Sequence, residues 1–402
     1  MSIAVQQGAF ERAEEQFKGL SDQLTQTGTL PFGNEFFEVE GKDSKKKHPY
    51  WWVLGRAAQE LKEWNLALGI NMDYALIHHD HPRALLAYLK TLVSGAEWQL
   101  TVNKLSVEKR AVGENVFETA NYQKFSQVVC ELRKLCQSNE IDRWYARGEA
   151  VFHPSTASVK TLASVYSTDT DAAALINSLG RLGNLESAVQ IGSQFSESCQ
   201  VNIQLGLLDR ADNYDLAYES AVKACKIEPH NPLALVTLAR AAQRCGDLTQ
   251  ALEMIEAAIS FWKNEPAWEI WAGELAEQCE QYPAAVQHLE RANQLTPGKP
   301  AILSSLAKLY LKVGAVSSAI QTLETAVYVE SEDSNLWVTL SEAYLAGGDY
   351  QSGLRSIDKA VNLNNQNPDA FILGGELSLA LGNLAMTEKY VQAAIACKPS
   401  NA

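Results

Sequence analysis

Apolar residues recur along the second half of the chain with the spacing of amphipathic helices. Between Gly246 and Ala258, a Gly-Asp pair is followed by apolar residues at intervals of three and four, which places them on one face of a helix. The same arrangement returns every 34 residues, and its last small residue forms a column of alanines: Ala224, Ala258, Ala292, Ala326, Ala360 and Ala394. This period predicts a repeated helical unit from about residue 198 to residue 399.

A second predicted helix precedes each of these helices. It carries its own column of small residues, namely Ala239, Gly273, Ala307, Ser341 and Gly375. Glycines mark the turn between the two helices at Gly246, Gly314, Gly348 and Gly382. Small side chains at fixed positions let two helix axes approach closely, whereas larger ones cost roughly 1–3 kcal/mol in overpacking. Each unit is therefore predicted to be a tightly packed helical hairpin.

This pattern resembles the tetratricopeptide repeat, a helical hairpin with a period of 34 residues. Residues matching its first-helix signature are Trp337, Leu340, Ser341 and Tyr344. The resemblance implies an all-α fold, a right-handed α-α superhelix in which antiparallel helical hairpins stack into a solenoid. It also implies that the first helix of each pair lines a concave groove.

The regularity of the pattern divides the chain into two parts. We expect residues 196–402 to form a regular array of about six units, and residues 1–195 to form a divergent helical-repeat region of the same superhelix. Residues 95–170 have a helical pattern without a readable repeat register. Residues 29–49 are predicted to be an insertion, and the lysines at 45–47 are expected in a polar loop within it.

Charge and cysteine usage narrow the function class. The chain has 402 residues and a formal net charge of −14, and residues 201–402 hold 14 basic and 24 acidic side chains. Such an acidic surface repels phosphate backbones, so nucleic-acid binding is not expected. No apolar stretch is long enough to span a membrane and no secretory signal is recognised. The seven cysteines form no Cys-x-x-Cys pair, which favours a reducing cytoplasm.

Catalytic and metal-binding patterns are weak. The sequence contains no phosphate-binding loop, nucleophile elbow or zinc-protease motif, so we expect no enzyme activity and no cofactor. The run from His78 to His81 is a weak metal candidate through His78, His79 and His81. Neighbouring residues on an extended loop point in different directions, so a solvated loop before Pro82 is the favoured interpretation.

The residues that the resemblance assigns to the groove are mixed apolar and acidic. They occupy the fifth, ninth and twelfth positions of successive units: Val236, Arg240, Gln243, Ile270, Glu274, Glu277, Ser304, Lys308, Leu311, Val338, Glu342, Leu345, Ile372 and Glu376. The fifth and ninth positions never combine Lys with Asn, as chaperone-binding members do to hold a terminal carboxylate. A partner segment with basic and aliphatic residues suits this groove better.

Two tryptophans near the groove have a structural and a functional interpretation. Trp268 and Trp271 lie one helical turn apart and could anchor a partner. Alternatively, they fill the space left by the small residues Ala272, Gly273 and Ala276, and we favour this core interpretation.

Together these patterns predict a non-catalytic protein interaction scaffold or adaptor. The alternative is a regulatory or assembly module of a larger enzyme or of a secretion or envelope complex. The last predicted helix bears Tyr390, Val391 and Ile395 without a capping helix after it. Self-association or docking through uncapped ends is therefore a further expectation.

Overall fold

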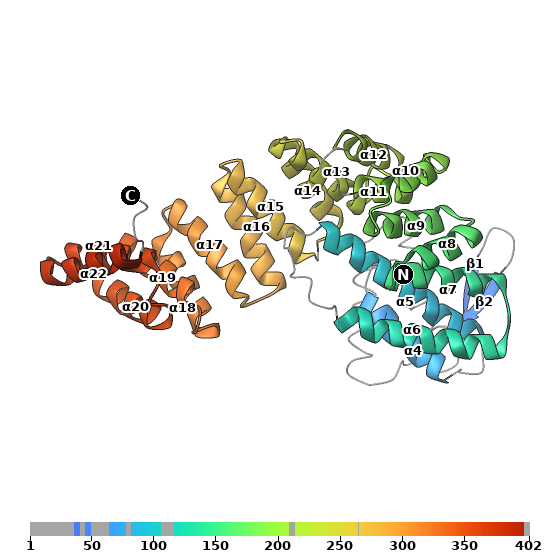
Figure 1. Cartoon of the computed structure of the whole chain (residues 1–402), viewed down its shortest axis with the longest axis horizontal. Helices are drawn as coiled ribbons and strands as arrows, with labels where there is room; N and C mark the ends of the chain where they lie inside the picture. The colour runs from blue at the N-terminus through green and yellow to red at the C-terminus, as the bar shows by residue number, and fades with distance from the viewer. Residues whose placement is uncertain are drawn as a thin grey trace. The chain divides into compact units, whose positions relative to one another are not determined.

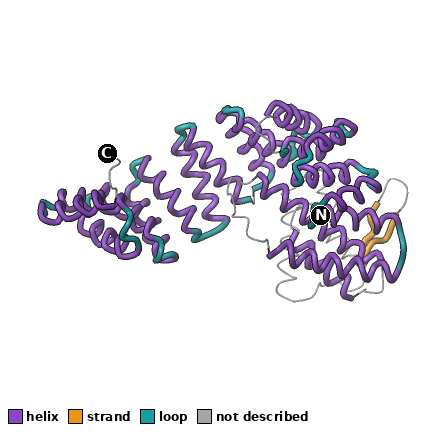
Figure 2. The backbone as a smooth tube through the Cα atoms, viewed as in Figure 1, coloured by secondary structure: helices purple, strands orange, loops and turns teal. Residues whose placement is uncertain are grey.

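The computed structural model describes residues 36–40, 45–49, 64–77, 82–105, 116–208, 214–263 and 265–397. Almost all of these residues are helical (Figure 2). Contacts within the chain form two compact units, Met1–Asn213 and Tyr214–Ala402. The all-α solenoid prediction is confirmed.

The second unit is an array of helical hairpins (Figure 1). It opens with α12 (Tyr214–Ile227). The first helices of the following pairs are α13 (Pro232–Arg244), α15 (Pro266–Gln278), α17 (Pro300–Lys312), α19 (Ser334–Gly347) and α21 (Pro368–Ala380). Their second helices are α14 (Leu248–Phe261), α16 (Tyr282–Leu295), α18 (Val316–Val329), α20 (Tyr350–Leu363) and α22 (Leu384–Cys397). Each second helix from α12 to α20 also packs on the first helix that follows it.

Local sequence explains where the first helices begin. Four of them start with a proline at their first turn, namely Pro232, Pro266, Pro300 and Pro368. Proline is favoured there because its missing N–H would have no partner in the helix. The fifth, α19, is capped instead by Asp333, whose side chain accepts a hydrogen bond from the Asn335 backbone N–H at 2.8 Å.

The turn inside each hairpin needs a left-handed backbone. Gly246, Gly314, Gly348 and Gly382 all have positive φ angles. Glu280 occupies the equivalent position between α15 and α16, and its φ is 59°. A side chain in this conformation costs roughly 1–2 kcal/mol, because its Cβ approaches the following carbonyl oxygen. The repeat geometry therefore imposes the turn even where the sequence does not offer glycine.

We predict that Glu280→Gly stabilises the array. The gain is expected to be about 0.5–1 kcal/mol, since glycine adopts positive φ freely but loses more entropy on folding. Urea denaturation followed by circular dichroism measures it. Gly314→Glu, which places the same side chain at the next turn, is expected to be destabilising by a similar amount. A loss of stability in Glu280→Gly would contradict this account of the turn.

The small-residue columns lie in the core of the array. The second-helix alanines Ala224, Ala258, Ala292, Ala326 and Ala360 are each 0% exposed, whereas Ala394 on the last helix is half-buried. The first-helix column is buried too. Ala239, Ala307 and Ser341 are 0% exposed, and the glycines Gly273 and Gly375 are also buried. At Gly273 an added Cβ would lie 3.1 Å from the Leu289 side chain, which shows how closely α15 and α16 approach. The predicted packing of the hairpins is confirmed.

The first unit is also helical but less regular. Its helices are α4 (Trp64–Ile77), α5 (Pro82–Leu105), α6 (Val116–Leu135), α7 (Asn139–Phe152), α8 (Thr156–Val165), α9 (Asp169–Arg181), α10 (Leu185–Gln194) and α11 (Cys199–Gly206). Consecutive odd-numbered helices from α5 to α11 pack on one another, and α4, α6, α8 and α10 pack beside them. The α9–α10 turn at Gly183 again has a positive φ, as in the array.

The segment predicted as an insertion contains strands. β1 (Phe36–Glu40) and β2 (Lys45–Pro49) pair antiparallel, with Val39 opposite Lys46 and Phe37 opposite His48. The prediction of a polar loop at Lys45–Lys47 is therefore wrong. Pairing with β1 satisfies backbone hydrogen-bonding groups of this segment. A run of three lysines gives no indication of that pairing.

The boundary between the two compact units does not coincide with the position where the repeat pattern becomes regular. Contacts separate the units after Asn213, whereas the pattern becomes regular after residue 195. Helix α11, which the sequence assigns to a unit spanning residues 198–231, packs on α9 and α10. The boundary at residue 195 stays a prediction about the repeats.

Candidate partner-binding groove

The predicted groove positions lie on the five first helices of the array, α13, α15, α17, α19 and α21. All but two of them are half-buried or exposed: Arg240, Gln243, Ile270, Glu274, Glu277, Ser304, Lys308, Leu311, Glu342, Leu345, Ile372 and Glu376. Val236 and Val338 are instead 0% and 7% exposed. Val338 is part of the apolar cluster with Ile357 and Leu373. These two valines stabilise the hairpins and offer no surface to a partner.

Some of the accessible groove residues already have partners elsewhere in the array. The Glu277 carboxylate lies 2.6 Å from the Lys312 ammonium group. Gln243 accepts a hydrogen bond from the Trp271 indole N–H at 3.2 Å. Because these groups have partners within the array, they contribute less to the binding of a charged segment than their sequence positions suggest.

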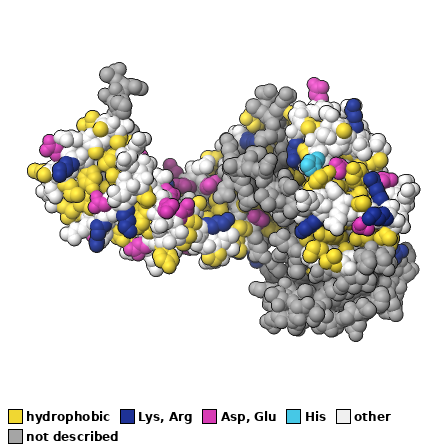
Figure 3. All heavy atoms as spheres, turned by 60° about the horizontal axis from the view of Figure 1, so that its bottom comes forward, with side chains coloured by type: hydrophobic (Ala, Val, Ile, Leu, Met, Phe, Trp, Pro, Cys, Tyr) yellow, Lys and Arg dark blue, Asp and Glu magenta, His cyan; other side chains and the backbone are white. Residues whose placement is uncertain are grey.

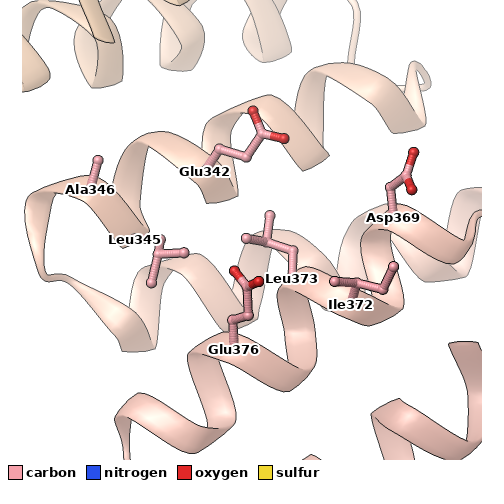
Figure 4. A pocket seen from close by; sticks show the side chains of 7 residues that line it. All are labelled: Glu342, Leu345, Ala346, Asp369, Ile372, Leu373 and Glu376. Atoms are coloured by element: carbon pink, nitrogen blue, oxygen red, sulfur yellow. The ribbon is translucent and has the colours of Figure 1, made fainter. Parts of the chain in front are cut away.

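A pocket of about 400 Å³ lies between α19 and α21. Glu342, Leu345 and Ala346 line it from α19, and Asp369, Ile372, Leu373 and Glu376 line it from α21. Figure 4 shows the carboxylates of Glu342, Asp369 and Glu376 around the apolar side chains of Leu373 and Ile372. The structure thus brings together four predicted groove residues, Glu342, Leu345, Ile372 and Glu376, and adds Asp369.

The pocket carries an excess of negative charge. No ion pair joins Glu342, Asp369 or Glu376 to a Lys, Arg or His among the residues described. Although much of the Glu342 side chain is exposed, desolvation by neighbouring atoms raises the pKa of its carboxyl, and the charges of Asp369 and Glu376 raise it further. The positive charge of Lys308 opposes this rise. A cation placed here would relieve the repulsion between the carboxylates.

Apolar and acidic side chains also lie close together on the wider surface of the array. Figure 3 shows yellow and magenta side chains intermixed over the part of the array that leads to the C-terminus. Ile372 is 48% exposed beside Glu376. This mixture agrees with a surface that contacts both aliphatic and basic groups.

The two tryptophans of α15 belong to the core. Trp268 and Trp271 are each 1% exposed. They lie on the helix that also bears the buried Ala272, Gly273 and Ala276. The core interpretation is confirmed, so these indoles are not available as anchors for a partner.

The last helix of the array, α22, exposes apolar side chains. Leu384, Val391 and Ile395 are 70%, 47% and 66% exposed. The residues equivalent to Val391 in the two preceding units, Ile357 and Leu323, are both 0% exposed. Docking or self-association at this surface stays a prediction.

The sequence also raised the questions of a metal site and of membrane-spanning helices. His78, His79 and His81 lie outside the described residues. Across the ranges that are described, no group of three His, Cys, Asp or Glu side chains could hold a metal ion. Within those same ranges, no helix is both long enough and apolar enough to cross a membrane.

Comparison with known families matches one part of the array. Residues 278–343 match the tetratricopeptide repeat family. No curated protein matches the chain. Among solved structures, the chain is similar to YrrB, described as a TPR protein with an unusual peptide-binding site, at 18% identity and a TM-score of 0.40, over 46% of this chain and 95% of that one.

Two further solved structures show the same level of similarity. PilF of Pseudomonas aeruginosa aligns at 19% identity and a TM-score of 0.39, over 52% of this chain and 95% of that one. The C-terminal part of a TPR repeat-containing protein from Cytophaga hutchinsonii aligns at 12% identity and a TM-score of 0.48, over 56% of this chain and 95% of that one.

The family match lies inside the array, where it runs from the last residue of α15 through α16, α17 and α18 into α19. The matched residues share their 34-residue period, their buried small-residue columns and their left-handed turns with the hairpins before and after them. The comparison therefore assigns residues 278–343 to the tetratricopeptide repeat family, and the hairpins on either side of them repeat the same architecture.

Proposed function

We propose that the chain is a non-catalytic scaffold or adaptor that binds a segment of a partner protein in the groove of its repeat array. Tetratricopeptide repeats generally serve as interaction modules, and stacked repeats present an extended binding surface. The rigid hairpins hold this surface in place before binding. A preformed surface of this kind lowers the entropic cost of association on the side of the array.

The pocket between α19 and α21 is the observation that carries the proposal. Three carboxylates surround an apolar floor there, and no described cation pairs with them. A lysine or arginine side chain would supply the missing positive charge, and an adjacent aliphatic side chain would cover Ile372 and Leu373. We therefore propose a partner segment that combines basic and aliphatic residues.

The cytoplasm is the compartment that we propose for this interaction. All seven cysteines of the chain are free, and Cys199 is buried. Reduced thiols without disulfide partners are typical of a reducing compartment. The partner segment would then be an intracellular one.

Charge reversal in the pocket tests the proposal. We expect Glu342→Lys, Asp369→Lys and Glu376→Lys, combined in one variant, to abolish the selection of basic peptides from a displayed peptide library. The purified wild-type protein is expected to enrich peptides in which Lys or Arg neighbours Leu, Ile or Val. The lost attraction acts between groups in direct contact, so the loss should exceed about tenfold in affinity for an enriched peptide.

A control variant with the same change in net charge distinguishes the effect of the pocket carboxylates from the effect of the overall charge of the protein. Glu253→Lys, Glu330→Lys and Glu332→Lys reverse three exposed acidic residues of the array that do not line the pocket. This variant is expected to retain the wild-type peptide preference with a modest loss at low salt. Equal losses in the two variants would refute the pocket as the binding site.

A further inference from the structure

A buried glutamate interrupts an apolar column of the array. Glu269 on α15 is 1% exposed. The residues at the equivalent position of the other first helices are all apolar: Leu235, Leu303, Trp337 and Phe371. The fold therefore does not need a charge at this position. A buried carboxylate is expensive unless other groups compensate it, so its partners are informative.

Glu269 is compensated by side chains from the following helix. One carboxylate oxygen, Oε2, lies 2.8 Å from Nδ1 of His288 on α16. The other, Oε1, lies 3.1 Å from Nε of Arg291 on the same helix. The far side of the imidazole reaches α14, where Nε2 lies 3.4 Å from Glu256 Oε1. His288 thus connects α14 of one hairpin with α15 of the next.

Each nitrogen of the His288 ring lies near a carboxylate oxygen. An ionised carboxylate only accepts hydrogen bonds, and a neutral imidazole has a single N–H. Both ring nitrogens can donate to carboxylates only when His288 is protonated. Burial alone would lower the pKa of His288, but hydrogen bonds and charges from Glu269 and Glu256 outweigh burial and raise it.

The charged groups at this junction come from all three of its helices. Glu256 belongs to α14, Glu269 to α15, and Arg291 to α16, where it neutralises the second oxygen of Glu269. Helix α17 also packs on α16. Among the described residues, the charges that act on the His288 ring are those of Glu269 and Glu256.

We propose that His288 is a pH-sensitive clamp between two consecutive hairpins of the array. The protonated ring ties Glu256 on α14 to Glu269 on α15. Loss of the proton removes one of these two hydrogen bonds and leaves two carboxylates without the cation between them. The junction of α14 with α15 and α16 then loosens. Since α15 also carries Ile270 and Glu274 of the groove, the clamp acts on the helix that positions them.

The direction of the pH effect follows from linkage. The pKa of His288 is higher in the folded protein than its ordinary value. The stabilisation from protonation is therefore complete below the pKa of the unfolded chain, and it is lost as the pH rises through the folded-state pKa. We expect the clamp to be closed in mildly acidic solution and to open on the alkaline side.

Histidine NMR measures the protonation directly on the full-length wild-type protein. The imidazole signal that is missing from His288→Gln identifies His288, and we expect it to titrate above about pH 6.5. Hydrogen exchange, corrected for intrinsic rates, measures the junction. Local opening of α14–α16 is expected to increase between about twofold and tenfold from about pH 6 to about pH 9.

Variants separate the clamp from other titrating groups. Glu269→Leu restores the residue type of the repeat column, and both it and His288→Gln should remove the pH dependence of α14–α16 opening. The control His153→Gln, which replaces an exposed histidine of the first unit, should keep it. The proposal is overturned if His288 titrates at or below about pH 6.5, or if the opening of α14–α16 depends on pH equally in Glu269→Leu and the wild type.

Discussion

Arg147→Ala is expected to destabilise the first unit by roughly 3–5 kcal/mol, the cost of breaking a buried ion pair by removing one partner. Arg147 is 7% exposed. Its Nε and Nη2 each donate a hydrogen bond of 2.6 Å to Glu97. Its Nη1 donates to Thr170 at 3.1 Å and to Asp171 at 3.4 Å. One guanidinium therefore ties α7 to α5 and α9.

Removal of this group leaves charges that nothing else fully compensates. The Asp171 side chain is 2% exposed, and its remaining cationic neighbour is Arg143, whose Nε lies 3.7 Å from Oδ2. Glu97 loses both of its short hydrogen bonds. Alanine also vacates the space that the guanidinium fills over the Trp144 ring, whose centroid is 4.7 Å away. Denaturant unfolding of the full chain, with hydrogen exchange to locate the loss in α5, α7 and α9, measures the effect.

Arg133→Ala is the matched control. Arg133 pairs with Asp142 at 3.4 Å, but the two side chains are 47% and 61% exposed. A solvent-exposed pair of this kind contributes at most about 1 kcal/mol. The difference between the two arginine variants isolates the effect of burial. Similar losses in both would show that the Glu97–Arg147–Asp171 network does not hold the first unit together.

The sequence does not signal this network. Glu97 and Arg147 are 50 positions apart, within the stretch whose repeat register is not readable. An arginine and a glutamate on helical segments ordinarily predict solvated faces. Only the packing of α5 against α7 makes them neighbours. Helices α6 and α7 approach closely in the same way, since a Cβ added at Gly148 of α7 would overlap the Phe125 ring of α6.

The structure of the array is easier to predict than that of the first unit because its sequence pattern repeats every 34 residues. A residue that departs from its column stands out against its equivalents, so both Glu269 and Glu280 carry a signal in the sequence. Comparison of Glu269 with Leu235 and Leu303 marks it as exceptional by sequence alone. Its partners His288 and Arg291 could not be inferred in the same way, since surface positions of the second helices vary freely.

The candidate site was predicted in part. The resemblance to the tetratricopeptide repeat placed Glu342, Leu345, Ile372 and Glu376 on one surface, and the pocket contains all four. Asp369 was missed, although it stands at the second position of its unit, on the same stripe as Ile372. Val338 was assigned to the groove but is buried. Helical spacing defines a stripe to within about one residue position, so the edge of a stripe can face the core.

Ala326→Trp is expected to destabilise the array by roughly 3 kcal/mol or more, the upper range for overpacking a core. Ala326 on α18 is 0% exposed. It belongs to the cluster formed by Leu303 and Ala307 of α17 and by Leu336, Leu340 and Ala343 of α19. An indole has no space there unless α18 moves away from both of its neighbours. Because each hairpin stabilises the next, the loss should spread to adjacent units.

Thr325→Trp places the same indole one residue earlier on the same helix, where the native side chain is exposed. Its cost is expected to stay within about 0.5 kcal/mol, as for other surface substitutions. Urea denaturation of the two variants, with hydrogen exchange over α17–α19, measures the contrast. The alanine column places the helices of each hairpin close together, so the buried variant must lose protection in α17 and α19 while the exposed one keeps it. Equal behaviour of the two would mean that the column does not set the spacing of the helices.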